Sequence, residues 1–202
     1  LTPMPSRAGP RPRLAPALAL AGSSVRGTVE HHRFLRDDDR FAPRRQRHRS
    51  ARLGSARKML RAELLPGQRA LHFKHESDSS RSRILRRISG TTARVTVYRT
   101  PAGMPELIAR ELTLRAMFRD AVEGGAELVV IDRDDSAVPH DRRWLSEEHR
   151  SFTLRPDIRF NHSKRHEEPL LAIPDAVGWC LQRGRPWTAR VSSLVARSLD
   201  LG

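Results

Sequence analysis

The sequence predicts an α/β domain over residues 53–202. Three observations lead to this prediction. Segments with strand and helix patterns alternate from residue 71 to residue 132. The stretch ARVTVYRT, residues 93–100, alternates apolar and polar side chains, as a half-buried strand does. The stretch ELVVIDRDDS has a continuous apolar run at residues 128–131, which is typical of a strand buried on both faces. Alternating strands and helices favour parallel pairing.

Two helices are predicted in the first part of this domain. The first starts at Ser55 as its N-cap and stops at the Pro-Gly pair of residues 66–67. The second covers residues 78–89, with Ser77 or Asp78 as its cap and Gly90 at its end. Both therefore carry recognisable start and stop signals.

Between these helices, residues 71–77 (LHFKHES) predict a strand. His72 and His75 lie three residues apart in it, a spacing that puts two side chains on opposite faces of a strand. The two histidines are therefore not expected to act as a metal-binding pair.

Later elements follow the same kind of signal. Pro105 suits the first position of a helix that Gly124 ends. A helix is predicted near residues 138–150 and an edge strand at residues 158–160. A last helix starts near Pro169, and its apolar stripe is Leu170, Ile173, Val177, Cys180 and Leu181.

The formal net charge of +15 is concentrated near the start of the chain. Residues 1–69 contain 16 Lys and Arg against 5 Asp and Glu, or +11, and residues 70–202 contain 22 against 18, or +4. Residues 1–52 are rich in Arg and Pro and have no helical or strand periodicity, which predicts a disordered basic arm. The charge makes DNA or RNA a candidate partner.

Several classes are excluded or disfavoured by composition. The single Cys180 excludes an intrachain disulfide and a zinc site built on paired cysteines, and is compatible with a reducing compartment such as the cytoplasm. Apolar runs stay well below the roughly 20 residues that cross a bilayer, so no membrane association is expected. The apolar segment near the start is interrupted by Pro16, which argues against a signal peptide. The oligomeric state is not predictable.

Asp175 is the first candidate site residue, because it lies within the apolar stretch LLAIPDAVGWC. Helical spacing puts it on one face with Leu171 and Trp179, at the border of the core. A carboxylate partly removed from water needs a partner. A metal ion, a backbone amide or an arginine such as Arg183 or Arg94 could serve.

Glu76 and Asp132 are the second and third candidates, since each follows a predicted strand. Ligand sites in parallel sheets gather at the carboxyl ends of the strands. The alternative for Asp132 is a solvated turn together with Asp134 and Asp135. The alternative for Glu76 is a place in the cap of the following helix.

The order of elements, together with the acidic residues in HFKHES, LVVID and LLAIPDAVGW, resembles a ribonuclease H-like domain of a family of uncharacterised bacterial and phage proteins. The resemblance covers about residues 53–200 and implies a mixed sheet flanked by helices. It implies that Glu76, Asp132 and Asp175 bind Mg²⁺ or Mn²⁺ for phosphodiester cleavage, and so are catalytic. The first strand of such a domain, with its metal-anchoring aspartate, is not found before residue 53.

Two function classes follow. The first is a metal-dependent nuclease, or an inactive relative of one, with at least three converging carboxylates. The second is a non-catalytic protein with a degenerate site that binds nucleic acid through its arginines. In the second class, the carboxylates are scattered or paired with arginines, and binding weakens steeply with salt.

Overall fold

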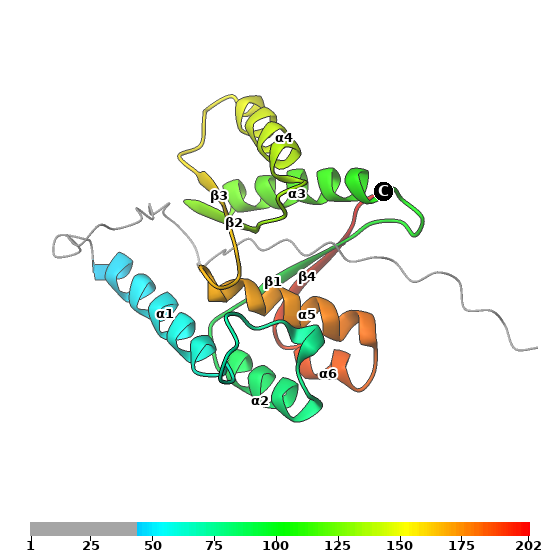
Figure 1. The fold of residues 1–202 in the computed structure, drawn as a ribbon. Coiled ribbons are helices and arrows are strands. Elements are labelled where there is room, and N and C mark those ends of the chain that lie inside the picture. Colours follow the sequence, from blue (N-terminus) through cyan, green and yellow to red (C-terminus); the bar gives the residue numbers. More distant parts are fainter. Residues whose placement is uncertain (1–43) are drawn as a thin grey trace, which may run out of the picture.

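The computed structural model describes residues 44–202, with side chains from Ala51 onward (Figure 1). The part of the predicted arm before Arg44 lies outside the described residues. Helices and strands alternate as the sequence predicts for an α/β protein. The described elements, in chain order, are α1 (Arg44–Arg61), the 3-10 turn η2 (Phe73–His75), α2 (Asp78–Ser89), β1 (Val95–Arg99), α3 (Glu106–Glu123), β2 (Leu128–Asp132), α4 (Val138–Ser151), β3 (Arg159–Ser163), the 3-10 turn η3 (Pro169–Leu171), α5 (Ala172–Arg183), α6 (Trp187–Val191) and β4 (Val195–Asp200).

The strands form two small parallel ladders instead of one mixed sheet. β1 pairs with β4, with Thr96 opposite Arg197, and β2 pairs with β3, with Val130 opposite Asn161. Within residues 44–202 no strand pairing joins the two ladders. The α/β class is confirmed, whereas the expected mixed pairing is wrong for the strands described.

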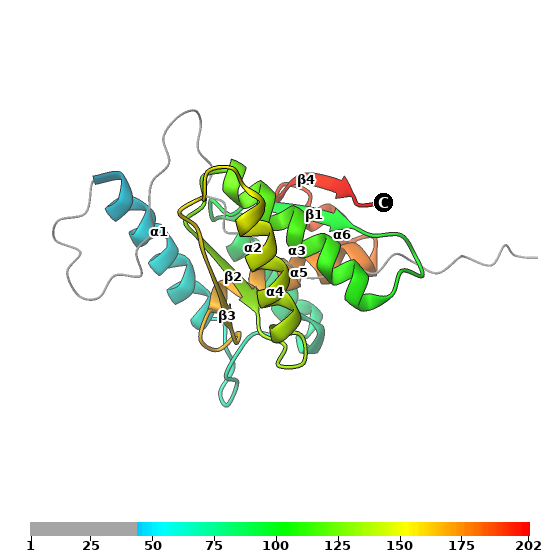
Figure 2. The same cartoon turned by 90° about the horizontal axis from the view of Figure 1, so that it is seen from above.

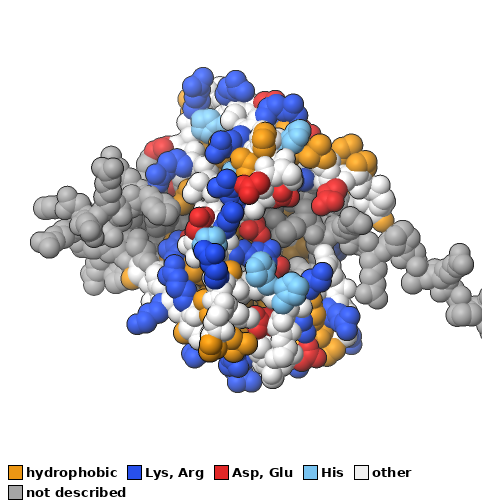
Figure 3. Space-filling view, in the orientation of Figure 1, with side chains coloured by type: hydrophobic (Ala, Val, Ile, Leu, Met, Phe, Trp, Pro, Cys, Tyr) orange, Lys and Arg blue, Asp and Glu red, His pale blue; other side chains and the backbone are white. Residues whose placement is uncertain are grey.

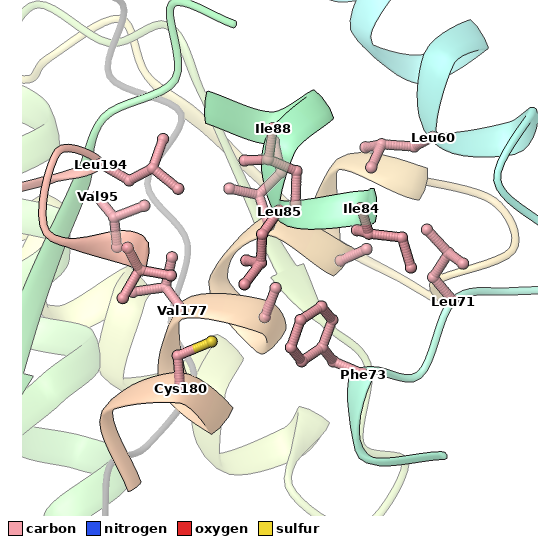
Figure 4. Packing of buried hydrophobic residues seen from close by; sticks show 14 of the residues in the cluster. Leu60, Leu71, Phe73, Ile84, Leu85, Ile88, Val95, Val177, Cys180 and Leu194 are labelled. Carbon is pink, nitrogen blue, oxygen red and sulfur yellow. The ribbon is translucent and has the colours of Figure 1, made fainter. Parts of the chain in front are cut away.

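Most of the buried apolar side chains form two hydrophobic cores. The first core lies among α1, α2, α5 and α6, which we call the helical lobe, and Figure 4 shows its side chains converging between these helices. The second lies among α3, α4, β2 and β3, which we call the α3–α4 lobe. β1 joins the two cores, because Val95 and Val97 pack in the first and Tyr98 in the second. Figure 1 shows β1 and β4 running between the lobes.

Several elements lie where the sequence predicts them. α2 begins after Ser77, whose Oγ accepts a hydrogen bond from the backbone N–H of Ser80 at 3.2 Å, and its C-cap is Gly90. β1, β2 and α3 match the predicted segments, and Gly124 ends α3. β2 is buried over Val129, Val130 and Ile131, as its continuous apolar run indicates. These local signals are sufficient because tertiary packing agrees with them.

The start of the first helix differs from the prediction. α1 begins at Arg44 instead of near Ser55, so residues 44–52, which we expected to belong to the arm, are helical. Arg is a good helix former, and its high density in this stretch hides the helix from an analysis based on apolar periodicity. Figures 1 and 2 show the first turns of α1 extending away from the other elements.

The predicted strand at residues 71–77 is also wrong, because the segment forms the turn η2. Its backbone groups are satisfied by side chains and not by a neighbouring strand. Asp175 accepts a hydrogen bond from the Phe73 N–H at 3.0 Å, while Arg81 donates to the carbonyl oxygens of Phe73 at 2.9 Å and Lys74 at 2.8 Å. A segment held this way needs no sheet partner.

Two features concern the first turns of α5 and α3. Pro174 lies in the first turn of α5, where its missing N–H removes no hydrogen bond from the interior of the helix. Leu107 and Ile108, at the start of α3, are about half exposed and do not join the apolar stripe of that helix. Of the helices described, none combines the length and apolar character needed to cross a membrane.

Candidate functional site: two carboxylates joined by Arg165

Asp175 lies in the first turn of α5, at the border between the core and the junction of the two lobes. Its Oδ2 atom accepts two interactions: one from the Phe73 N–H at 3.0 Å and one from the Arg165 guanidinium at 2.8 Å. The sequence analysis proposed both an arginine and a backbone amide as possible partners of Asp175. The arginine is Arg165, and neither Arg183 nor Arg94 takes that role.

Asp132 meets the same guanidinium from the other lobe. It ends β2, and its Oδ2 accepts a hydrogen bond from Arg165 Nε at 2.8 Å and forms an ion pair with Nη2 at 2.8 Å. Asp132 is therefore held in an ion pair and is not a freely solvated turn residue. Arg165 comes from the segment that joins β3 to η3, so it connects the α3–α4 lobe to the helical lobe through two carboxylates.

Asp132, Arg165 and Asp175 form a triad, and its two carboxylates keep Arg165 positively charged. Burial by itself would lower the pKa of Arg165, but the charge of Asp175 and the hydrogen bond to Asp132 raise it above its ordinary value. Arg165 Nη1 also contacts His72 Nδ1 at 3.3 Å. Because a guanidinium can only donate, His72 Nδ1 accepts and the ring proton lies on Nε2.

Glu76 forms hydrogen bonds with residues outside this triad. Its side chain is only 4% exposed, and both carboxylate oxygens are occupied: Oε1 by Gln68 Nε2 at 3.2 Å and Oε2 by Ser80 Oγ at 2.9 Å. Ser80 is in the first turn of α2, so Glu76 supports the start of that helix, as its alternative interpretation proposed.

The arrangement of the three predicted ligands does not fit a pair of divalent cations. Arg165 occupies the space where Asp132 and Asp175 meet, and the oxygens of Glu76 are bonded to neutral donors. In the part of the chain that the structure describes, no group of three or more His, Cys, Asp or Glu side chains could hold a metal ion. Asp132 and Asp175, two of the three predicted site residues, thus share a partner, but this partner is Arg165 and not a metal ion.

A hollow of about 320 Å³ opens beside the triad. Its polar lining is Gln68, Arg69, His72, His75, Glu76 and His166. His72 and His75 are close because η2 is a 3-10 turn, in which side chains three residues apart lie nearly above one another, and their ring centroids are 6.1 Å apart. The expectation that they point to opposite sides depended on the strand and is wrong. Figure 3 shows histidine and acidic side chains near the centre of the face that it draws.

A second charged cluster was missed by the sequence analysis. Asp141 in α4 is completely buried, accepts two hydrogen bonds from Arg110 at 2.8 and 2.7 Å, and contacts His162 Nε2 at 2.9 Å. Its only sequence signal is helical spacing, which puts Asp141 and Glu148 on one face with Trp144 and Leu145. An acidic residue on an apolar face indicates a buried partner.

Arginines neutralise other buried acids in the same way. Glu148 is held by Arg119 at 2.5 Å. Glu63 is held by Arg83 at 2.7 Å and Arg87 at 3.2 Å, and Glu168 by Arg57 at 2.6 Å. Much of the arginine content of the described chain therefore serves the interior.

Cys180 and two tryptophans have packing roles. Burial raises the pKa of Cys180 to about 12, so its thiol is a weak nucleophile at neutral pH, as its place in the apolar stripe predicts. The rings of Trp179 and Trp187 contact each other edge to face, with Arg81 above the first and Arg190 above the second.

The fold and the triad define an α/β protein in which one arginine forms ion pairs with two carboxylates, one from each lobe. Comparison of the chain with protein-family models, with curated proteins and with solved structures found no match.

Proposed function

We propose that the protein binds nucleic acid, DNA or RNA, and does not cleave it. The observation that carries this proposal is the charge of α1, whose sequence RRQRHRSARLGSARKMLR contains eight Lys and Arg residues and no acidic residue. Phosphate groups are recognised mainly by such clusters of basic side chains.

The surface concerned continues from α1 to α2. Glu63, just after α1, bonds Arg83 and Arg87 of α2, which brings the end of α1 beside that helix. We define the basic surface as the exposed side chains of Lys58, Arg61, Arg83, Arg86 and Arg87. Four more arginines, Arg44, Arg45, Arg47 and Arg49, precede them in the first turns of α1.

Arg165 is the reason to expect binding without cleavage. It forms ion pairs with both Asp132 and Asp175, the carboxylates that a two-metal nuclease would use. A positive guanidinium repels divalent cations from the oxygens it bonds.

A charge-neutral variant tests the basic surface. Replacement of Lys58, Arg61 and Arg86 by Gln is expected to weaken binding to a fluorescent 20-base-pair duplex about tenfold or more at roughly 100 mM NaCl, because three phosphate contacts are lost. Fluorescence anisotropy measures the change, for a single-stranded RNA as well as the duplex.

The matched control replaces Arg142 and Arg155, which are exposed in and beyond α4, by Gln. It should leave affinity within about twofold after correction for its smaller loss of charge. Equal losses in both variants would mean that the net charge matters and the surface does not.

A second candidate function is a divalent-metal-dependent nuclease of ribonuclease H-like fold. The observation that favours it is that Asp132 and Asp175, two of the three residues that the resemblance assigns to Mg²⁺ or Mn²⁺, contact the same arginine. This candidate requires Arg165 to leave both carboxylates before a cation binds.

Calorimetric titration of MnCl₂ separates the two candidates. The first proposal expects no saturable heat from the folded wild-type protein. The second expects binding that Asp175→Asn abolishes, together with cleavage of a labelled oligonucleotide in the same buffer. Asp135→Asn, a change at an exposed aspartate outside the triad, is the control.

A further inference from the structure

We infer that the hollow beside η2 binds the terminal phosphate of a nucleic acid strand, a phosphomonoester with three free oxygens. This inference extends the proposed nucleic-acid binding to a specific end of the ligand. The hollow is lined by side-chain donors, contains one acidic residue and lies next to the basic surface in the chain.

The hollow contains donors that the fold leaves available. Arg69 is exposed and, among the described residues, forms no hydrogen bond or ion pair. His72 has its Nδ1 occupied by Arg165, so its Nε2 carries the proton and can donate. The ring of His75 contacts His72 and, within the described chain, forms no hydrogen bond. One guanidinium and two imidazoles are a suitable donor set for a phosphate.

Glu76 is the one acidic side chain in the lining, and each of its carboxylate oxygens already accepts a hydrogen bond. Gln68 and Ser80 donate to its two oxygens, and it is almost completely buried. Arg165 lies outside the lining and contacts His72 Nδ1 at 3.3 Å. The donors of the lining are therefore the Arg69 guanidinium and the ring N–H groups of His72 and His75.

The ligand class follows from the number and charge of these donors. A phosphodiester inside a strand carries one negative charge and two free oxygens. A terminal phosphomonoester carries close to two charges and a third free oxygen near neutral pH. A hollow with three separate donors thus favours the end of a strand over its interior.

The position of the hollow connects it to the basic surface. Gln68, Arg69, His72 and His75 all belong to the segment that joins α1 to α2, the two helices of that surface. Arg81 of α2 holds this segment through the carbonyl groups of Phe73 and Lys74. A strand lying along the basic surface can therefore end in the hollow.

The direct test compares the hexamer dT6 with and without a 5′-phosphate, each labelled at its 3′ end, by fluorescence anisotropy with the full chain. We expect the phosphorylated hexamer to bind about tenfold more tightly, since it adds charge-assisted hydrogen bonds. The double variant Arg69→Gln/His75→Gln should lose this preference and keep the affinity for unphosphorylated dT6. Arg155→Gln is the control, and thermal unfolding of each variant checks that it folds.

Three results would overturn the inference: equal affinity for the two hexamers, a preference that survives in the double variant, or equal affinity for dTMP and phosphorylated dT6. The last would identify a free mononucleotide as the ligand. If neither hexamer binds, the proposed function fails, and a separate experiment tests the phosphate site. Inorganic phosphate is added to the full chain, with NaCl of equal ionic strength as the control. NMR shifts of the His72 and His75 rings on adding phosphate support a phosphate site, and unshifted rings reject it.

Discussion

Replacement of Asp141 by Asn is expected to lower the free energy of unfolding by about 3–5 kcal/mol, the effect of removing one partner from a buried ion pair. Asp141 is 0% exposed, and the variant would leave the Arg110 guanidinium without its counter-charge and His162 without its acceptor. Urea denaturation followed by circular dichroism measures the loss. Asp135→Asn, whose side chain is 64% exposed, should change stability by less than about 1 kcal/mol.

The same residue predicts how stability responds to acid. Burial would raise the pKa of Asp141, but hydrogen bonds from Arg110 and His162 hold it below its ordinary value. A carboxyl whose pKa is lower in the folded than in the unfolded chain stabilises the fold above the unfolded pKa, about 3.9. This stabilisation is lost as pH falls below that value, and Asp141→Asn should flatten this part of the curve. An unchanged acid limb in the variant would contradict the assignment.

Replacement of Arg165 by Met is expected to destabilise the protein by about 2–3 kcal/mol, because it removes the ion pairs with two carboxylates and leaves Asp132 and Asp175 without their shared cation. The methionine keeps most of the length of the side chain. Arg133→Met, at a neighbouring exposed arginine paired with Asp135, is the control and should have little effect.

A double-mutant cycle makes this prediction specific. Asp175→Asn combined with Arg165→Met should destabilise less than the sum of the two single changes, with a coupling of about 1 kcal/mol or more. Additive effects would mean that Arg165 and Asp175 do not interact in solution, and the ion-paired triad would be rejected.

The fold was predictable where local and tertiary preferences agree. The alternation of β1 and the apolar run of β2 leave little choice of conformation, and Ser77 and Gly90 delimit α2. The turn η2 was not predictable, because it depends on Arg81 and Asp175, which approach only after folding.

The candidate site was predictable only in part. A carboxylate in the stretch LLAIPDAVGWC requires a partner, and Asp175 has one in Arg165. The identity of the partner was not accessible, since Arg165 looks like a surface residue within the charged stretch SKRHEE. Glu76 follows an element that proved to be a turn, so the rule about strand ends did not apply to it.

The measurement that most directly tests nucleic-acid binding by the basic surface is the salt dependence of affinity for the labelled 20-base-pair duplex. With at least three phosphates neutralised, the association constant should fall about 40-fold between 50 and 200 mM NaCl, with a slope near −0.9 per phosphate in a plot of log K against log salt. In the Lys58, Arg61 and Arg86 variant, the slope should become shallower by about 0.9 for each contact removed. A saturable affinity that salt does not change, or no saturable binding at 50 mM NaCl, would contradict the proposal.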